Sequence, residues 1–307
     1  MNRREFITSG AAMALAGCTS VTGGKALALK RGAPRFHVFS KMFQSPVTSS
    51  PEALCDLMAA AGMDGVQWTV RPKGHVLPES VKTELPRLVR IAESRGLKCE
   101  SICTAITDGR DPIAETIAKT AADCGIRMFR TGYYFYDLKR ETFGQSMDRI
   151  KRGFASLAEL GERSKCKAVY QNHSSWGPSV FGGVVWDDYE CLKDHNPEHV
   201  GLEFDPMHAY YETNLSWTHG FDLVARWIAS LDLKDFHYVL SPKNPKMMKK
   251  SMVGAGKGIV PWKDVRKLVD AHGVDPLYIV HFEYNFDKTD LTKTVRNELS
   301  YFKKVFG

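Results

Sequence analysis

The 307-residue sequence is as notable for the signals it lacks as for those it contains. No apolar run reaches the roughly 18 residues that a membrane-spanning helix needs, and no segment is of low complexity. The seven cysteines form no C-x-x-C pair and no zinc-type spacing. No G-x-G-x-x-G follows the first expected strand, so we predict no nucleotide cofactor. These absences, together with 43% hydrophobic and 25% charged residues, are typical of an ordinary soluble globular protein.

The net charge of +7 is modest, and the basic residues are scattered. A nucleic-acid-binding surface would show a stripe of basic residues interleaved with aromatic ones, so we expect no nucleic-acid partner. One basic cluster stands out, and we interpret it as a solvated loop. Its members are Lys243, Lys246, Lys249 and Lys250.

The N-terminus has the features of an export signal. Arg3 and Arg4 precede Phe6, and a short stretch of small apolar residues ends in Leu-Ala-Gly before Cys18. R-R-x-F resembles a twin-arginine signal, and L-A-G-C resembles a lipobox. We predict an export signal over 1–18, with Cys18 as the lipidated first residue of a periplasmic or envelope-anchored protein, and a tether over 19–34. The alternative is a plain signal peptide in which Cys18 is incidental.

Six further cysteines lie mostly in apolar segments, and we expect them to be free, buried thiols. They are Cys55, Cys99, Cys103, Cys124, Cys166 and Cys191.

From residue 35 onward, short apolar strands alternate with amphipathic segments of helical length. Eight strands are predicted, at Phe36–Phe39, Gly65–Val70, Lys98–Cys103, Ile126–Thr131, Lys167–Asn172, Val200–Asp205, Ile228–Lys234 and Leu277–Phe282. Helices are predicted at Pro51–Gly62, Glu84–Arg95, Ile113–Cys124, Phe143–Arg163, Trp186–Lys193, Trp217–Trp227, Trp262–Ala271 and Leu291–Phe306.

This alternation indicates a parallel sheet, because parallel neighbours need a crossover connection. Eight such units predict an α/β fold, a single-domain (β/α)8 TIM barrel over 35–307. A doubly wound open sheet is the structural alternative. Active sites of such barrels form at the C-terminal ends of the strands, and seven of the eight ends here carry ionisable groups. A purely structural barrel gives no reason for that asymmetry, so we expect these groups to converge on one site.

Four motifs stand out in the second half of the chain: Asp205-x-x-His208 after V-G-L-E-F, Leu233-Lys234-Asp235, Gly254-x-Gly256-x-Gly258 and His281-x-Glu283. Together they resemble the xylose-isomerase-like TIM barrel superfamily. The runs at 68–79 and 170–174 are similar to its sugar phosphate isomerase/epimerase members. The resemblance covers about residues 35–305 and implies a carbohydrate partner. The superfamily also includes metal-dependent apurinic endonucleases. The further ligands of their trinuclear zinc site are not evident in this sequence, which argues against that activity.

The resemblance implies a divalent metal with four ligands, which fall here on Gln171, Asp205, Asp232 and Glu283. Two of the four depart from the family: Gln171, because an amide carries no charge although its carbonyl oxygen can bind a hard cation, and Asp232, which stands where the family has a histidine. Three carboxylates suit Mn²⁺ or Mg²⁺, and a nitrogen from His173 or His208 would suit Zn²⁺, Co²⁺ or Mn²⁺.

The implied activity is proton abstraction next to the carbonyl of a sugar or keto-sugar, as in an isomerase or epimerase. Gln171 cannot act as a base, so the catalytic candidates are Glu283, His208, His173 and Lys234. Candidates for substrate binding are Lys41, Arg71, His75, Arg130, Tyr133, Trp176 and His281. Two alternatives remain: a keto-glycoside lyase or hydratase, which needs one base only, and a non-catalytic sugar-binding lipoprotein.

Overall fold

The computed structural model describes residues 32–174 and 179–307. Eight parallel strands form a closed barrel in the order β1-β10-β7-β6-β5-β4-β3-β2, so each strand pairs with its sequence neighbours in the barrel and β10 closes on β1. The predicted (β/α)8 barrel is thereby confirmed. The strands are β1 (Phe36–Phe39), β2 (Gly65–Val70), β3 (Ser101–Thr104), β4 (Met128–Arg130), β5 (Lys167–Gln171), β6 (Val200–Phe204), β7 (Ile228–Leu233) and β10 (Leu277–Val280).

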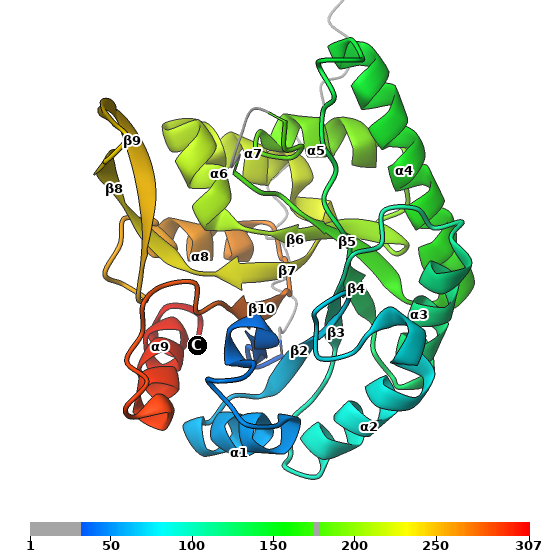
Figure 1. Cartoon of the computed structure of the whole chain (residues 1–307). Coiled ribbons are helices and arrows are strands. Elements are labelled where there is room, and N and C mark those ends of the chain that lie inside the picture. The colour runs from blue at the N-terminus through cyan, green and yellow to red at the C-terminus, as the bar shows by residue number, and fades with distance from the viewer. Residues whose placement is uncertain (1–31, 175–178) are drawn as a thin grey trace, which may run out of the picture. The chain divides into compact units, whose positions relative to one another are not determined.

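Helices surround the strands, as Figure 1 shows. They are α1 (Pro51–Ala61), α2 (Val81–Glu93), α3 (Pro112–Asp123), α4 (Phe143–Ser164), α5 (Val185–Leu192), α6 (Pro206–Thr213), α7 (Trp217–Val224), α8 (Trp262–Ala271) and α9 (Leu291–Phe306). Short 3-10 turns lie at Ser40–Phe43, Pro78–Ser80, Asn214–Ser216 and Ala225–Trp227. In the described residues, no helix is both long enough and apolar enough to cross a membrane.

Local sequence signals account for where these helices begin and end. The Ser50 side chain accepts the Ala53 N–H at the start of α1, and Thr142 and Gln145 form a reciprocal capping box at the start of α4. Helix α1 ends at Gly62, whose φ of 87° lies in the left-handed region that glycine adopts without steric cost. These ends set the chain up to enter the next strand.

The apolar core is divided by the barrel wall. The main cluster packs the outward face of the strands against the helices. A small separate cluster of Phe39, Cys103, Leu277 and Ile279 comes from β1, β3 and β10 and fills part of the barrel interior. The rest of the interior is polar, and its buried polar side chains are the ones that build the site. The six cysteines of the described chain are free, and five of them are buried, as expected.

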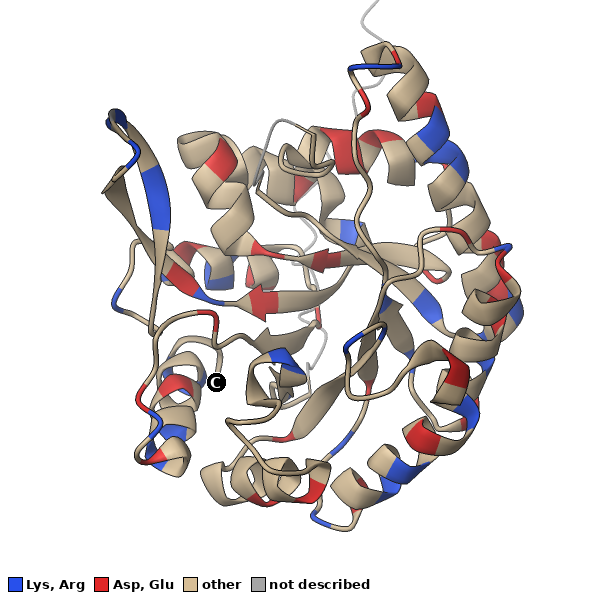
Figure 2. Ribbon diagram, in the orientation of Figure 1, with Lys and Arg blue, Asp and Glu red and all other residues tan. Residues whose placement is uncertain are grey.

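One helix and one two-stranded hairpin were missing from the sequence-based prediction. Helix α6 follows β6 directly, with the Asp205 side chain accepting the His208 N–H and Pro206 in its first turn. The second is an antiparallel hairpin of β8 (Asp235–Ser241) and β9 (Asn244–Val253). The lysine cluster expected to be a solvated loop lies on this hairpin, whose basic residues are visible in Figure 2.

Candidate active site at the barrel mouth

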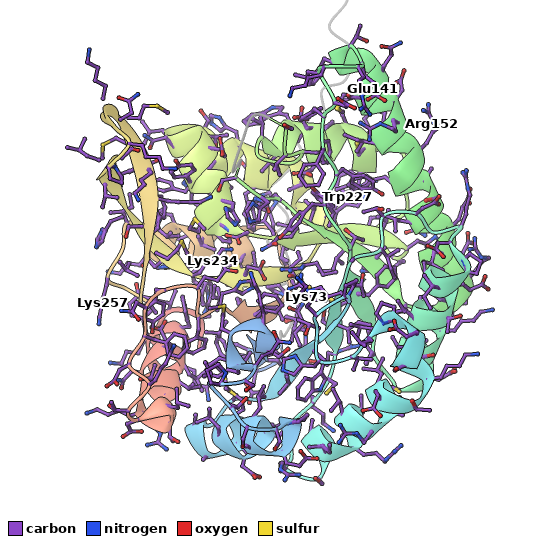
Figure 3. The ribbon with its side chains drawn as sticks, viewed as in Figure 1. Lys73, Glu141, Arg152, Trp227, Lys234 and Lys257 are labelled. Carbon is purple, nitrogen blue, oxygen red and sulfur yellow. The ribbon has the colours of Figure 1, made fainter. Side chains whose placement is uncertain are left out.

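Strands β6, β7 and β10 deliver charged side chains at positions two residues apart. Side chains alternate across a strand, so residues i and i+2 share a face. Glu203 and Asp205 follow this spacing along β6, and Asp232 and Lys234 follow it along β7. All four are buried within the barrel, with at most 4% of their surface exposed. Figure 3 labels Lys234, which lies inside the ring of helices.

Lys234 links two carboxylates at the mouth. Its Nζ lies 2.9 Å from Asp205 Oδ2 and 3.2 Å from Glu283 Oε2. Burial would lower the pKa of Lys234, but Asp205 and Glu283 outweigh it and raise the pKa well above its usual range. The ammonium is therefore charged at neutral pH.

Glu283 also faces a second ammonium, because Lys41 Nζ lies 3.8 Å from Oε1. Burial would raise the pKa of Glu283, but Lys234, His281 and Lys41 outweigh it and hold the pKa well below its usual range. About a quarter of the Glu283 side chain remains exposed. Glu283 is therefore an ionised carboxylate that solvent, and hence a ligand, can reach.

Gln171 makes hydrogen bonds with four side chains around the mouth. Its Nε2 donates to Asp205 Oδ2 at 3.1 Å and to Asp232. Its Oε1 accepts from Arg130 at 3.0 Å and from the Tyr133 hydroxyl. The amide thus presents its N–H groups, and not its oxygen, to the carboxylates.

A second acidic group lies on the same strands and contains a residue that the sequence analysis missed, Glu203. Glu203, Asp232 and His281 each offer a ligand atom, and these atoms lie within 4.8 Å of one another, so this group could hold a metal ion. His281 Nε2 lies 3.0 Å from Asp232 Oδ1. Burial and repulsion from Asp232 raise the pKa of Glu203 to about 8, against the pull of Arg130, 3.3 Å away. The acidic residue inside the apolar run V-G-L-E-F was the available signal.

Histidines and a lysine form a chain on the other side of Asp205. His208 Nδ1 lies 2.6 Å from the Ser174 hydroxyl, which also accepts from Lys250 of β9. The ring centroids of His173 and His208 are 3.8 Å apart, and His208 Nε2 lies 3.5 Å from Asp205. Burial lowers the pKa of His173 to about 2 and that of His208 well below its usual range, in both cases aided by Lys234.

Lys250 is a second residue that sequence reasoning missed. Burial and the charge of Lys234 lower its pKa to about 8. Its position depends on the β8–β9 hairpin, and no local motif around Lys250 indicates that it reaches the mouth.

The remaining candidates are distributed as follows. His75 contacts Ser40 and Thr69 at 3.2 and 2.9 Å, near the ends of β1 and β2. The backbone of Arg71 closes the same loop. Trp176 lies outside the described residues. Arg130 and His281 are buried below the mouth, with 3% and 2% of their surface exposed.

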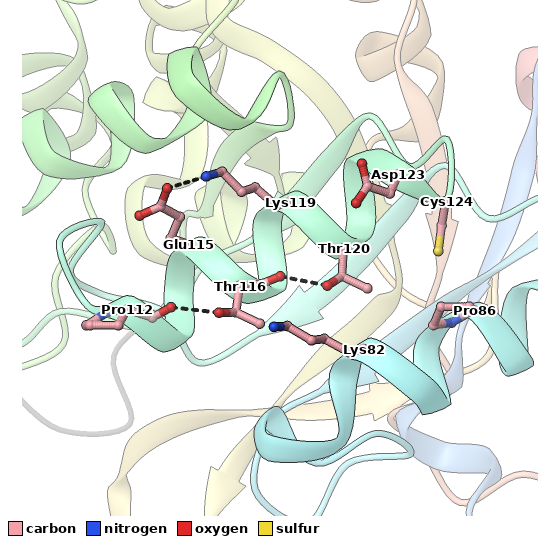
Figure 4. A pocket seen from close by; sticks show the side chains of 9 residues that line it. All are labelled: Lys82, Pro86, Pro112, Glu115, Thr116, Lys119, Thr120, Asp123 and Cys124. Atoms are coloured by element: carbon pink, nitrogen blue, oxygen red, sulfur yellow. Dashed lines mark hydrogen bonds and ion pairs between the residues drawn. The ribbon is translucent and has the colours of Figure 1, made fainter.

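A hollow of about 590 Å³ lies beside the site after β4, lined mainly by the aromatic run Tyr133 to Tyr136. Tyr133 belongs to both the hollow and the Gln171 network. A groove of similar size, about 580 Å³, lies between α2 and α3 (Figure 4). There Glu115 pairs with Lys119, and Thr116 and Thr120 bond to their own helix. That groove gathers no comparable set of buried charges, so the barrel mouth is the better candidate.

Residues 55–305 match the family model "Xylose isomerase-like TIM barrel", and the chain belongs to this family. No curated protein sequence matches.

Solved structures share the fold at low sequence identity. D-psicose 3-epimerase from Clostridium cellulolyticum H10, solved with D-tagatose, has a TM-score of 0.65 and 11% identity, over 89% of this chain and 99% of that chain. The E. coli 3-keto-D-glucoside 4-epimerase YcjR has a TM-score of 0.65 and 10% identity, over 88% and 99%. The IOLI protein with a bound zinc atom has a TM-score of 0.66 and 15% identity, over 89% and 98%.

Proposed function

We propose that this protein is a carbohydrate-modifying enzyme that abstracts a proton next to the carbonyl of a sugar or keto-sugar. The observation that carries the proposal is the reachable Glu283 carboxylate beside the buried Lys234 ammonium, 3.2 Å apart at the barrel mouth. A base and a fixed positive charge at this separation can act on the two ends of one H–C–C=O unit.

In the proposed step, Glu283 takes the proton from the carbon next to the carbonyl. The electron pair of that C–H bond moves onto the carbonyl oxygen, which becomes an oxyanion facing Lys234. Because the pKa of Glu283 is low, the carboxylate is a weak base. The step therefore needs a carbon acid that the ammonium makes more acidic, which favours a ketone over an unactivated sugar carbon.

The proton must then return from another group. The Lys250–Ser174–His208 chain ends beside Asp205 and supplies one, because a lysine with a pKa near 8 can give up a proton at neutral pH. Return to another carbon or to the opposite face gives an isomer or epimer. Loss of a group from the next carbon, with its bonding electrons, gives the lyase reaction instead.

Substrate contacts are assigned to the more accessible side chains around the mouth: Lys41, Arg71, His75 and the described Tyr133, with Trp176 as the remaining candidate. Tyr133 and its neighbours offer aromatic surface for a sugar ring. Arg130 donates to Gln171, and His281 lies 3.0 Å from Asp232, so these two side chains are assigned to positioning Gln171 and Asp232.

A divalent ion, when bound, would be held by Glu203, Asp232 and His281. Carboxylate and imidazole ligands accept Mn²⁺, Mg²⁺, Co²⁺ and Zn²⁺. Such an ion would supply positive charge among buried carboxylates, one of which already carries a raised pKa.

One observation favours a second candidate, a sugar-binding protein without activity. Gln171 stands where the family resemblance implies a titratable ligand, so one of two expected carboxylates is absent. The density of ionisable groups at Lys234, Glu283 and Lys250 favours the enzyme, since binding alone does not require it.

The site of action is also a proposal: an exported protein, periplasmic or lipid-anchored to the envelope. The residues on which it rests, 1–18, lie outside the described part of the chain. Export favours a free or oxidised sugar or a glycoside over a sugar phosphate.

The test is hydrogen exchange in D₂O, followed by NMR over a panel of free sugars, keto-sugars and keto-glycosides. We expect loss of one carbon-bound proton signal with a keto-substrate. Binding without exchange across the whole panel would favour the binding protein.

A further inference from the structure

Two hydrogen-bond donors, Gln171 and Lys234, already face the carboxylates at the positions where the family resemblance implies metal ligands. Gln171 turns its N–H groups toward Asp205 and Asp232. Lys234 Nζ lies between Asp205 and Glu283. A divalent cation binds to lone pairs on oxygen, and these donors face the same lone pairs.

We propose that the Lys234 ammonium takes the place of a divalent cation at the barrel mouth, so that a built-in organic cation binds the carbonyl oxygen of the substrate. This inference rests on the proposed function for its substrate class, a keto-sugar, but not for its claim about metal binding.

The donor set at the mouth does not fit a metal ion for reasons of charge and distance. A hard cation lies about 2.0–2.6 Å from its oxygen ligands. Bound to Asp205 Oδ2 it would come close to Lys234 Nζ, which is 2.9 Å from the same oxygen. Repulsion between the two cations is weakly screened in a buried site. The amide at Gln171 removes a further negative charge that would have held the ion.

The ammonium is also held in place by burial and by a fixed carboxylate. Lys234 is 4% exposed and extends from the end of β7, between β6 and β10. Asp205 is fixed in turn, because its backbone N–H donates to Asn172 Oδ1 at 2.7 Å and its carbonyl oxygen accepts from Asn172 Nδ2 at 3.1 Å. Its Oδ1 accepts the His208 N–H, which leaves Oδ2 for Lys234 and Gln171.

This arrangement suits the reaction. An ammonium has three N–H donors, and two are directed at Asp205 and Glu283. The third can be donated to a carbonyl oxygen, on which negative charge develops as Glu283 takes the neighbouring proton. A fixed donor of this kind lowers the barrier because it is oriented before the charge forms.

The test is a titration of the purified chain with Mn²⁺, followed by EPR of the free ion. Wild type should show no Mn²⁺ site that depends on Asp205. Lys234→Met should gain about one Mn²⁺ per chain, and the added change Asp205→Asn should remove it. Gln171→Glu in the Lys234→Met background should tighten it. Lys267→Met, at an exposed lysine on α8, is the matched control and should gain none.

Two outcomes overturn the proposal: a wild-type Mn²⁺ site that Asp205→Asn abolishes, or a folded Lys234→Met that gains no site. Circular dichroism checks folding, and Lys234→Gln serves if the methionine variant does not fold. A wild-type Mn²⁺ ion that is lost in Glu203→Gln but kept in Asp205→Asn is bound by the group of Glu203, Asp232 and His281. In that case the Lys234→Met variant still decides the proposal, because it should gain a further ion. Failure of the proposed function appears separately, as no exchange with any sugar.

Discussion

Glu283 lies between the ammonium groups of Lys234 and Lys41, and its ionisation depends on them. Lys250 is the matching group on the other side of Asp205, where burial lowers its pKa to about 8. One group is thus ready to accept a proton at neutral pH and another to give one up. The separation of acid and base roles follows from burial at Lys250 and from the positive charges that Glu283 faces.

Lys250→Met should lower turnover about 10²-fold or more, the usual worth of a general acid. The wild-type donor is protonated below a pKa of about 8, so the rate should fall as pH rises through 8. That basic limb should be absent from the variant, as measured in a pH–rate profile. Lys249→Met, at an exposed neighbour on β9, should keep both the rate and the limb; equal profiles for all three proteins would exclude Lys250 as the donor.

At the scale of elements, the β8–β9 hairpin is what brings Lys250 to the mouth. Asp235 anchors its base by accepting from the backbone N–H groups of Gly256, Gly258 and Val260 and from the Trp262 indole. The Gly254-x-Gly256-x-Gly258 turn therefore holds the hairpin. An added Cβ would meet Asp235 at Gly258, Tyr301 at Gly256 and Glu298 at Gly254.

Gly258→Ala should destabilise this anchor, since an added Cβ would lie 2.0 Å from Asp235 Oδ1 and 2.5 Å from the Phe236 carbonyl oxygen. We expect a loss of about 1–3 kcal/mol, the usual cost of overpacking, seen as a lower Tm. Activity should fall with it because Lys250 moves. Gly144→Ala, whose added methyl meets nothing within 4 Å, is the control. An unchanged Tm for Gly258→Ala would show that the turn adapts at little cost.

The elements also show what the sequence could and could not predict. The eight strands are recognisable because each is a short apolar run before a helical pattern. Glu203 was available from the alternation of side chains along a strand, since it lies two residues before Asp205 and residues two apart share a strand face. Lys250 could not be predicted as a site residue, because its contact with Ser174 spans 76 residues and depends on the β8–β9 hairpin. The lysines of that hairpin obscure the alternation of apolar and polar residues that marks a strand.

At the scale of the whole molecule, the barrel also has a titratable group away from the mouth, His37 of β1, which is fully buried. Burial, with Arg35 and Arg127 contributing, lowers the pKa of His37 to about 3, despite Asp64. The native state thus keeps His37 neutral, whereas the unfolded chain binds a proton below about 6.5.

Stability should therefore fall as pH drops from about 6.5 toward 3, by on the order of 3–5 kcal/mol from this group. Urea unfolding at several pH values measures the slope. In His37→Gln the acid-side slope should be shallower than in wild type, whatever its absolute stability. Identical slopes would mean that groups other than His37 cause the loss of stability at low pH.

Lipidation of the exported protein is the remaining proposal for the whole chain, and it depends on Cys18. Labelling with a radioactive fatty acid should mark the wild-type protein, and Cys18→Ala should lose the label. A label retained in Cys18→Ala, or a mature N-terminus at another residue, would remove the lipoprotein proposal without affecting the barrel.

The most direct test of the proposed chemistry is the exchange of carbon-bound hydrogen with D₂O in Glu283→Gln, compared with wild type on the same keto-sugar. The amide keeps the size and hydrogen bonding of the side chain but cannot take a proton. We predict that exchange slows by about 10²–10⁴-fold while the substrate still binds. Full exchange in Glu283→Gln would contradict the assignment of Glu283 as the base and make His173 or His208 the next candidate.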